Sequence, residues 1–310
     1  MVPVDEHLFE FRAMGSDCAV RVVVDGPFDA DEIGREVRAL VESLEQRWSR
    51  FRDDSELSQL NRHAGAPVFV SAETYDIISI AADAWRATSG LFDPTMHDAI
   101  AEVGYASSFD SEQGASARLS GGVSAVGLRA LELDPAIRMV RVPAGTHLDL
   151  GGIGKGRTAD LVAAALMARG VQGVCVDLGG DVRVSGHSVD GAGWAIAIDD
   201  PFEPGVDLAV VALSEGSVTT SSRLRRRWET PDGPAHHLLD PTTGRPANSG
   251  LAAVTVLAAD ASWGECHAKA ALLAGASDGQ RLLEDAGLCG VLITDDGRRI
   301  TAGPFDSFLV

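Results

Sequence analysis

Four glycines and a lysine stand together where the chain changes from an extended to a helical pattern. Residues 148–159 read LDLGGIGKGRTA, and the strand-like run 146–150 that leads into them contains Asp149. Glycines allow unusual backbone angles and let a ligand approach the backbone closely. A helix start adds free N–H groups and partial positive charge. The segment predicts a cradle for a phosphorylated ligand, and a plain glycine turn between a strand and a helix is the structural alternative.

Two familiar phosphate-binding motifs do not fit this segment. The Walker loop requires a serine or threonine directly after its Gly-Lys pair, and this chain has Gly156 there. The dinucleotide motif G-x-G-x-x-G fails as well, because the glycines fall at 151, 152, 154 and 156. The cradle is therefore neither of these two types.

The composition excludes some partners. The 310 residues carry a net charge of −19, and the basic run at 223–227 is short. Nucleic acids and anionic membranes attract basic surfaces, so neither is expected as a main partner. The N-terminus lacks the pattern of a leader and no run is long enough to span a bilayer, which predicts a cytoplasmic protein without a membrane anchor.

The four cysteines are far apart in the sequence. They lie at positions 18, 175, 266 and 289. This spacing predicts neither a disulfide framework nor a zinc site. Cys175, inside a Val-Cys-Val strand pattern, is expected to be a buried free thiol.

The pattern of apolar residues predicts an α+β fold with hairpins, mixed or antiparallel sheets and flanking helices. Strands are predicted at 8–13, 17–24, 146–150, 174–178, 181–187, 194–199, 207–213, 253–257 and 290–294, and helices at about 31–48, 73–87, 157–169, 263–274 and 278–286. Asp29 or Asp31 is expected to cap the first helix and Ser71 the second. Residues 105–125 are polar and rich in glycine, which is typical of a loop or an insertion.

Six short motifs in a fixed order carry a resemblance to a known family. They are SELSQLN at 55–61, FDPT at 92–95, DLGGIGKG at 149–156, GGD at 179–181, TS at 220–221 and HLLDPTTGRP at 237–246. The series resembles that of the ApbE-type FAD:protein FMN transferases from Met14 to about Gly275. The resemblance implies one ApbE-like, T-fold-like unit over residues 1–310, with FAD in a central cleft.

The resemblance also implies an activity and a set of residues. Such an enzyme cleaves FAD and attaches FMN by a phosphoester bond to a threonine or serine of an acceptor flavoprotein, with release of AMP. The positions that match the family's cofactor-binding residues are Met14, Phe51, Leu91, Phe92, Asp93, Asp149, Gly151, Gly152, Lys155 and His237. Phe51 offers an aromatic face for a planar ring, and Lys155 can neutralise diphosphate charge.

Three residues are the candidates for catalysis: Lys155, His237 and Asp240. No general base stands at a readable spacing, and Asp240 and Asp181 are possible bases that could equally well shape turns. Two other functions remain open. An FAD pyrophosphatase would release free FMN and AMP, and a flavin-binding protein would hold FAD without transfer.

The chain departs from the family at the expected magnesium site. In the family, an aspartate and a threonine four residues later bind the ion with a backbone carbonyl of the cradle. This chain has Glu265 and Lys269 at the two side-chain positions and Gly152 at the carbonyl position. Glutamate can bind magnesium, whereas an ammonium group only donates hydrogen bonds. Either Lys269 points away from a weakened site, or its ammonium stands in place of the ion.

Overall fold

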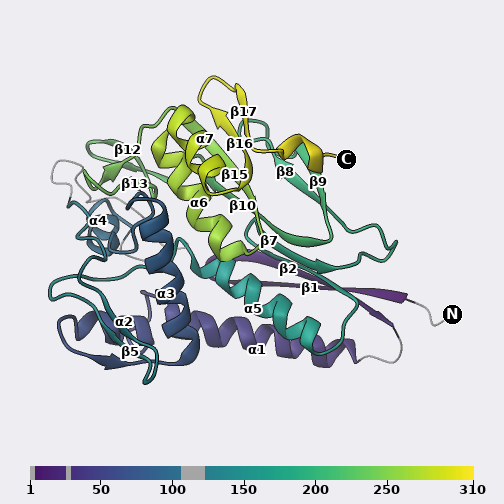
Figure 1. The fold of residues 1–310 in the computed structure, drawn as a ribbon, viewed down its shortest axis with the longest axis horizontal. Helices are drawn as coiled ribbons and strands as arrows, with labels where there is room; N and C mark the ends of the chain where they lie inside the picture. Colours follow the sequence, from purple (N-terminus) through teal and green to yellow (C-terminus); the bar gives the residue numbers. More distant parts are fainter. Residues whose placement is uncertain (1–3, 26–28, 106–122) are drawn as a thin grey trace.

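An antiparallel sheet of eight strands forms the centre of the chain in a computed structural model, which describes residues 4–25, 29–105 and 123–310 (Figure 1). In spatial order the strands are β1 (Val4–Ala13), β2 (Ser16–Asp25), β6 (Gly173–Leu178), β7 (Asp181–Gly186), β10 (Glu215–Ser222), β15 (Leu251–Ala258), β16 (Cys289–Thr294) and β17 (Arg299–Ala302). Each strand pairs antiparallel with its neighbour. The predicted α+β class with antiparallel sheets is confirmed.

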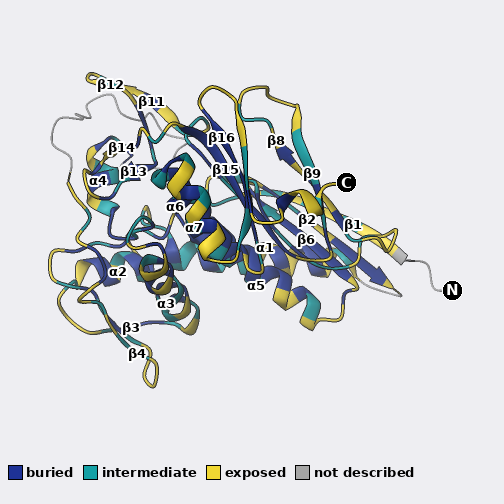
Figure 2. Ribbon diagram, turned by 45° about the horizontal axis from the view of Figure 1, so that its top comes forward, coloured by how far each residue is buried: buried dark blue, intermediate teal, exposed yellow. Residues whose placement is uncertain are grey.

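The two faces of this sheet are covered differently. One face packs against four helices: α1 (Ala30–Trp48), α5 (Gly154–Ala168), α6 (Ala261–Ala274) and α7 (Ala276–Asp285). The other face packs against the hairpin of β8 (Trp194–Asp199) and β9 (Asp207–Leu213) and the short 3-10 helix η2 (Phe305–Phe308). Figure 2 shows the buried residues gathered along the central strands, between these two layers.

The remaining elements gather at the end of the molecule opposite the two chain termini (Figure 1). They are α2 (Glu56–Arg62), β3 (Val68–Phe69), α3 (Ala72–Ala87), α4 (His97–Glu102), β4 (Glu132–Asp134), β5 (Met139–Arg141), β11 (Arg227–Thr230), β12 (Gly233–His236), β13 (Leu239–Asp240) and β14 (Arg245–Pro246). Most of these elements are too short to leave a periodic pattern in the sequence. Most of the loop expected at 105–125 lies outside the described residues.

Local sequence signals explain the elements that lead to the site. Asp29 caps α1 by accepting a hydrogen bond from Glu32, and Ser71 caps α3 as predicted. The β1–β2 turn has positive φ at both central residues, Met14 (52°) and Gly15 (65°). This is the two-residue turn that suits the twist of a hairpin. The turn therefore holds the Met14 side chain at one end of the sheet.

The strand predicted at 146–150 is wrong, because no neighbouring strand pairs with this segment. Its backbone bonds instead to a side chain: Leu148 N donates to Asn61 Oδ1 (2.8 Å) and Asn61 Nδ2 donates to Leu148 O (2.9 Å). Asp149 N donates to Pro94 O (2.8 Å). An amide side chain of α2 therefore replaces the strand partner that an extended, buried backbone requires.

The glycine run serves close packing more than special backbone angles. None of Gly151, Gly152, Gly154 and Gly156 has a positive φ, and α5 begins at Gly154 and not near residue 157 as predicted. A Cβ added at Gly156 would lie 2.5 Å from the carbonyl oxygen of Ala261. The missing side chain allows α5 and α6 to touch.

A buried carboxylate fixes the same contact from the other side. Asp160 on α5 accepts hydrogen bonds from the backbone N–H groups of Ala261 (2.8 Å) and Ser262 (3.0 Å) and from the Ser262 hydroxyl (2.7 Å). These bonds satisfy N–H groups of the first turn of α6. The start of α6 is thus locked to the middle of α5.

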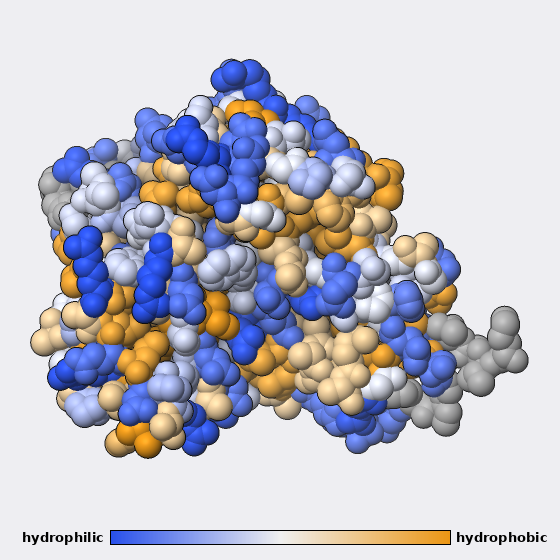
Figure 3. Space-filling model, in the orientation of Figure 1, coloured by the Kyte–Doolittle hydropathy of each residue, from blue (hydrophilic) through white to orange (hydrophobic). Residues whose placement is uncertain are grey.

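Among the residues that the structure describes, no helix is both long and apolar enough to cross a membrane. Figure 3 shows hydrophilic residues spread over the visible face between smaller apolar patches. The free thiol predicted at Cys175 is confirmed and lies buried in the sheet.

The two glycines at the start of α5 form a matched test of the helix contact. Gly156→Ala should lower the free energy of unfolding by about 1–3 kcal/mol, because the new methyl group meets the backbone of α6. Gly154→Ala should change it by less than about 1 kcal/mol, since its Cβ would enter open space. Urea unfolding at pH 7.5 measures both. Equal losses in the two variants would contradict the assignment of the contact to Gly156.

Candidate functional site

A pocket opens where α1 ends and α5 begins. It contains about 1270 Å³ of empty space, part of it open to solvent. All residues predicted to contact the cofactor line it: Met14, Phe51, Leu91, Phe92, Asp93, Asp149, Gly151, Gly152, Lys155 and His237. The structure thus brings five distant segments of the sequence to one place.

One part of the pocket wall is aromatic. Phe92 is buried, and the Phe51 and Tyr105 rings meet edge to face with centroids 6.0 Å apart. The Tyr105 ring also stacks on Trp228 at 5.7 Å. Faces of this kind can receive a flat heterocycle. Tyr105 was not predicted, because it lies outside the motifs.

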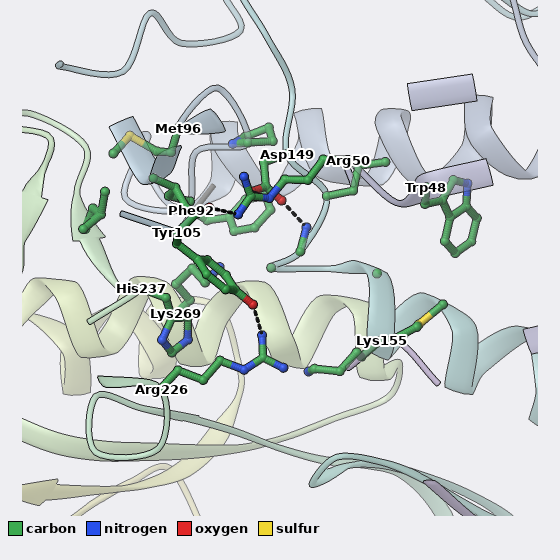
Figure 4. Close-up of a pocket in the computed structure, with 18 of the residues that line it drawn as sticks. Trp48, Arg50, Phe92, Met96, Tyr105, Asp149, Lys155, Arg226, His237 and Lys269 are labelled. Atoms are coloured by element: carbon green, nitrogen blue, oxygen red, sulfur yellow. Dashed lines mark hydrogen bonds and ion pairs between the residues drawn. The ribbon is translucent and has the colours of Figure 1, made fainter. Parts of the chain in front are cut away.

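An arginine that the sequence analysis missed orders the cradle (Figure 4). Arg50 Nε lies 3.1 Å from Asp149 Oδ2, and both side chains are almost fully buried. Asp149 Oδ1 accepts a hydrogen bond from Gly151 N (2.7 Å). The Arg50 guanidinium lies 4.3 Å from the centroid of the Phe51 ring. Asp149 therefore joins the bend of the cradle to the end of α1.

Asp93 orders the opposite segment of the wall. Its Oδ1 accepts hydrogen bonds from Thr95 N (2.8 Å) and Thr95 Oγ1 (2.7 Å), and its Oδ2 accepts one from Trp85 Nε1 (2.9 Å). Burial raises the pKa of Asp93, and these bonds oppose the rise. The carboxylate is thus occupied in shaping the turn beside Phe92.

Positive charge gathers at the cradle end of the pocket. The chain has two lysines, and both of them, Lys155 and Lys269, line this pocket with Arg226 and His237 (Figure 4). Lys269 reaches from α6 across to the cradle, where a Cβ at Gly152 would collide with its Nζ. Within the described residues Lys269 has no carboxylate partner, although its Nζ lies 6.0 Å from the centroid of the Phe92 ring. We call Lys155, Lys269 and Arg226 the cationic corner.

Two buried carboxylates hold Lys155 from behind. Its Nζ forms an ion pair with Asp181 and lies 3.3 Å from Glu265 Oε1. Burial lowers the pKa of Lys155, and the nearby Glu265 opposes this effect. Glu265 Oε2 accepts a hydrogen bond from Gly156 N at the start of α5 (2.8 Å). Neither carboxylate lines the pocket.

The residues at the expected magnesium site do not fit the ion in this arrangement. Magnesium requires close to six oxygen ligands in octahedral geometry. Here both oxygens of Glu265 accept from Lys155 or Gly156, and the Lys269 ammonium lies against Gly152. Of the two arrangements expected from the sequence, Lys269 therefore does not point away from the cradle, because its ammonium lies beside Gly152.

The candidates for catalysis separate into two groups. Lys155 and His237 line the pocket, but Asp240 does not. Asp240 Oδ1 accepts hydrogen bonds from Thr242 N (2.8 Å) and Thr242 Oγ1 (2.7 Å), and so it shapes a turn. Burial, Lys269 and Arg226 hold the pKa of His237 well below its usual value. His237 is therefore neutral, and its buried Nδ1 has no hydrogen-bond partner among the described residues.

The sequence and the structure resemble the same group of proteins. A model of the ApbE family matches residues 14–293. The FAD:protein FMN transferase of Vibrio cholerae is 28% identical over 317 residues, which cover 99% of this chain and 94% of the relative. The protein of the same name from Treponema pallidum is 31% identical over 94% of this chain and 86% of its own length.

Solved structures show the same fold. The flavin transferase ApbE from Vibrio cholerae superposes with a TM-score of 0.83 at 25% identity, covering 99% of this chain and all of that one. An ApbE protein from Thermotoga maritima has a TM-score of 0.86 at 24% identity, with 98% and 99% of the two chains covered.

His236, which precedes His237 in the sequence, makes the free energy of unfolding depend on pH. His236 Nδ1 accepts a hydrogen bond from Leu238 N (3.3 Å), and its Nε2 lies 3.1 Å from Ala247 O. This pattern requires a neutral ring, and burial lowers the pKa of His236. Below the unfolded-state pKa, near 6.5, the unfolded chain binds a proton that the folded chain does not.

The fold should therefore lose stability as the pH falls from 7.5 to 5.5. One such histidine lowers the free energy of unfolding by up to about 1.4 kcal/mol for each pH unit below its unfolded-state pKa. Burial lowers the pKa values of His237 and His267 as well, so they add to the effect. His236→Gln should reduce the pH dependence of the free energy of unfolding, measured in urea at three pH values. An unchanged slope in the variant would contradict the neutral role of His236.

Proposed function

The chain belongs to the ApbE family, and on that premise we propose that it transfers FMN from FAD to the hydroxyl of a threonine or serine in an acceptor flavoprotein. Two curated relatives that are named for this activity align with this chain over 94% and 86% of their own lengths. In the reaction, the acceptor oxygen forms a bond to the phosphorus on the riboflavin side of FAD. The bond from that phosphorus to the bridging oxygen breaks, and AMP leaves.

The observation that carries this proposal is the pairing of the cationic corner with an aromatic wall in one pocket. FAD is a diphosphate with a flat heterocycle at each end, so it matches both features. We propose that Met14 and Phe51 lie beside the isoalloxazine, with residues 91–93 on the adenine side. The diphosphate would then face Lys155 and the start of α5, where backbone N–H groups and positive charge favour anions.

His237 is the best-supported candidate for the general base. It lines the pocket, and its buried Nδ1 has no hydrogen-bond partner among the described residues, so this atom could accept the proton of the acceptor hydroxyl. It lies between Lys269 and Arg226, whose charges would favour the negative charge that develops on the phosphate oxygens. Asp240 is engaged in its turn and does not line the pocket, so it is a poorer candidate than His237.

Lys269 takes the place of the magnesium ion in this proposal. Its ammonium lies at the cradle without a carboxylate partner among the described residues, so its charge is available to a diphosphate. One ammonium supplies half the charge of a divalent ion, and Arg226 adds to it. FAD would therefore bind in the absence of divalent metal.

The first test is FAD binding in EDTA. Unmodified protein should bind FAD with the same affinity in EDTA and in magnesium, as measured by isothermal titration. Lys269→Met should weaken FAD binding in EDTA by about tenfold or more, since a charge-assisted hydrogen bond contributes about 1.5–3 kcal/mol, and should leave riboflavin binding unchanged. A strict requirement for magnesium in the unmodified protein would contradict the role of Lys269.

The second test follows the fate of FMN. The protein is incubated with FAD and a pool of threonine- and serine-containing peptides, and mass spectrometry searches for a peptide heavier by FMN less one water. We expect this adduct together with an equal amount of AMP. His237→Ala should lose the adduct and keep FAD binding. Free FMN with AMP in place of the adduct would identify a pyrophosphatase, and intact FAD throughout would identify a binding protein.

A further inference from the structure

Two histidines and an aspartate meet behind the pocket wall, outside all the motifs of the sequence. His97 and Asp98 begin α4, and His147 lies in the extended segment ahead of the cradle. Asp98 Oδ1 lies 2.9 Å from the Nδ1 atoms of both His97 and His147, and Asp98 Oδ2 lies 2.9 Å from His147 Nδ1. One atom from each residue lies within 4.8 Å of the other two.

We propose that His97, Asp98 and His147 form a site for a divalent transition-metal ion such as Zn²⁺. Imidazole nitrogens and a carboxylate oxygen are ligands that zinc takes at about 2.0–2.2 Å. The three groups are already gathered at hydrogen-bonding distance.

The exposure of the three groups suits a site that exchanges its ion with solvent. The side chains are 25%, 47% and 38% exposed for His97, Asp98 and His147, respectively. An ion held by three protein ligands keeps an open position for water. The hydrogen-bonded pairs His97–Asp98 and Asp98–His147 are the ordinary alternative, because a carboxylate between two imidazoles is stable without metal.

The site differs from the magnesium position of the family. None of its residues lines the pocket, but the neighbouring residues Met96 and Asp149 do. The backbone bond from Asp149 N to Pro94 O already joins the same two segments. A metal ion would reinforce the connection that Asp98 and His147 already make and hold α4 to the approach of the cradle. This structural role of the ion does not depend on which reaction the pocket catalyses.

Cobalt tests the site because its visible spectrum reports its ligands. Protein stripped with EDTA and dialysed is titrated with Co²⁺ and, in competition, with Zn²⁺. We expect one ion per chain, an absorption spectrum of nitrogen and oxygen ligands, and a rise of the melting temperature on binding. His97→Ala and His147→Ala should each weaken Co²⁺ binding at least tenfold, since removal of even an outer group behind a ligand costs about 10- to 100-fold.

The control is His187→Ala, which removes an exposed histidine in the loop directly after β7 and should leave Co²⁺ binding unchanged. Equal binding by the unmodified protein and both cluster variants would overturn the proposal, as would saturation only at millimolar Co²⁺. X-ray absorption of the zinc-loaded unmodified protein is a second test that needs no variant. Two imidazole ligands would support the site, and sulfur ligands would place the ion on a cysteine and overturn it.

Discussion

The contact between α5 and α6 is the constraint on which the site depends. Gly156 lets the helices touch, and Asp160 ties the first turn of α6 to α5. Glu265 completes the contact by bonding to Gly156 N. Because the two helices are held in one register, Lys155 at the start of α5 and Lys269 in the middle of α6 reach the same corner. A looser contact would separate the two charges that the proposed ligand needs together.

The charge of this corner has a physical consequence for binding. Lys155 is neutralised from behind by Asp181 and Glu265, whereas Lys269 has no such partner among the described residues. Gathering cations in a partly buried pocket costs free energy, and an anion that enters the pocket offsets the cost. We propose that the ammonium group of Lys269, carried by α6, supplies the charge that faces the diphosphate. On this proposal, the affinity for FAD should not depend on the concentration of divalent metal.

The sequence predicted those features that local chemistry determines. The Met14 hairpin and the caps at Asp29 and Ser71 follow from residue types at short spacing, whereas the pocket-lining positions were implied by the resemblance to the ApbE family. The predicted strand at 146–150 was wrong because its partner is the side chain of Asn61, 87 residues away. β10 was not predicted because its sequence, EGSVTTSS, is mostly polar. In the fold it is a central strand that pairs with β7 on one side and β15 on the other, and most of its residues are buried.

Residues that act through distant contacts could not be found from the sequence. Arg50 becomes part of the cradle only because α1 ends beside Asp149. Arg226 and Tyr105 reach the pocket from segments outside the motifs. The histidines at 97 and 147 are joined through Asp98 across 49 positions. In each case the residue type was ordinary, and only the folded chain shows its neighbours.

The central claim is that the cationic corner recognises the diphosphate of a flavin dinucleotide. Its most direct measurement is a comparison of the dissociation constants of FAD and riboflavin in EDTA, with the unmodified protein. The account predicts that FAD binds at least a hundredfold more tightly, because about 3 kcal/mol or more should come from charge-assisted bonds to the two phosphates. Equal affinities for the two flavins would show that the phosphates are not recognised and would contradict the account.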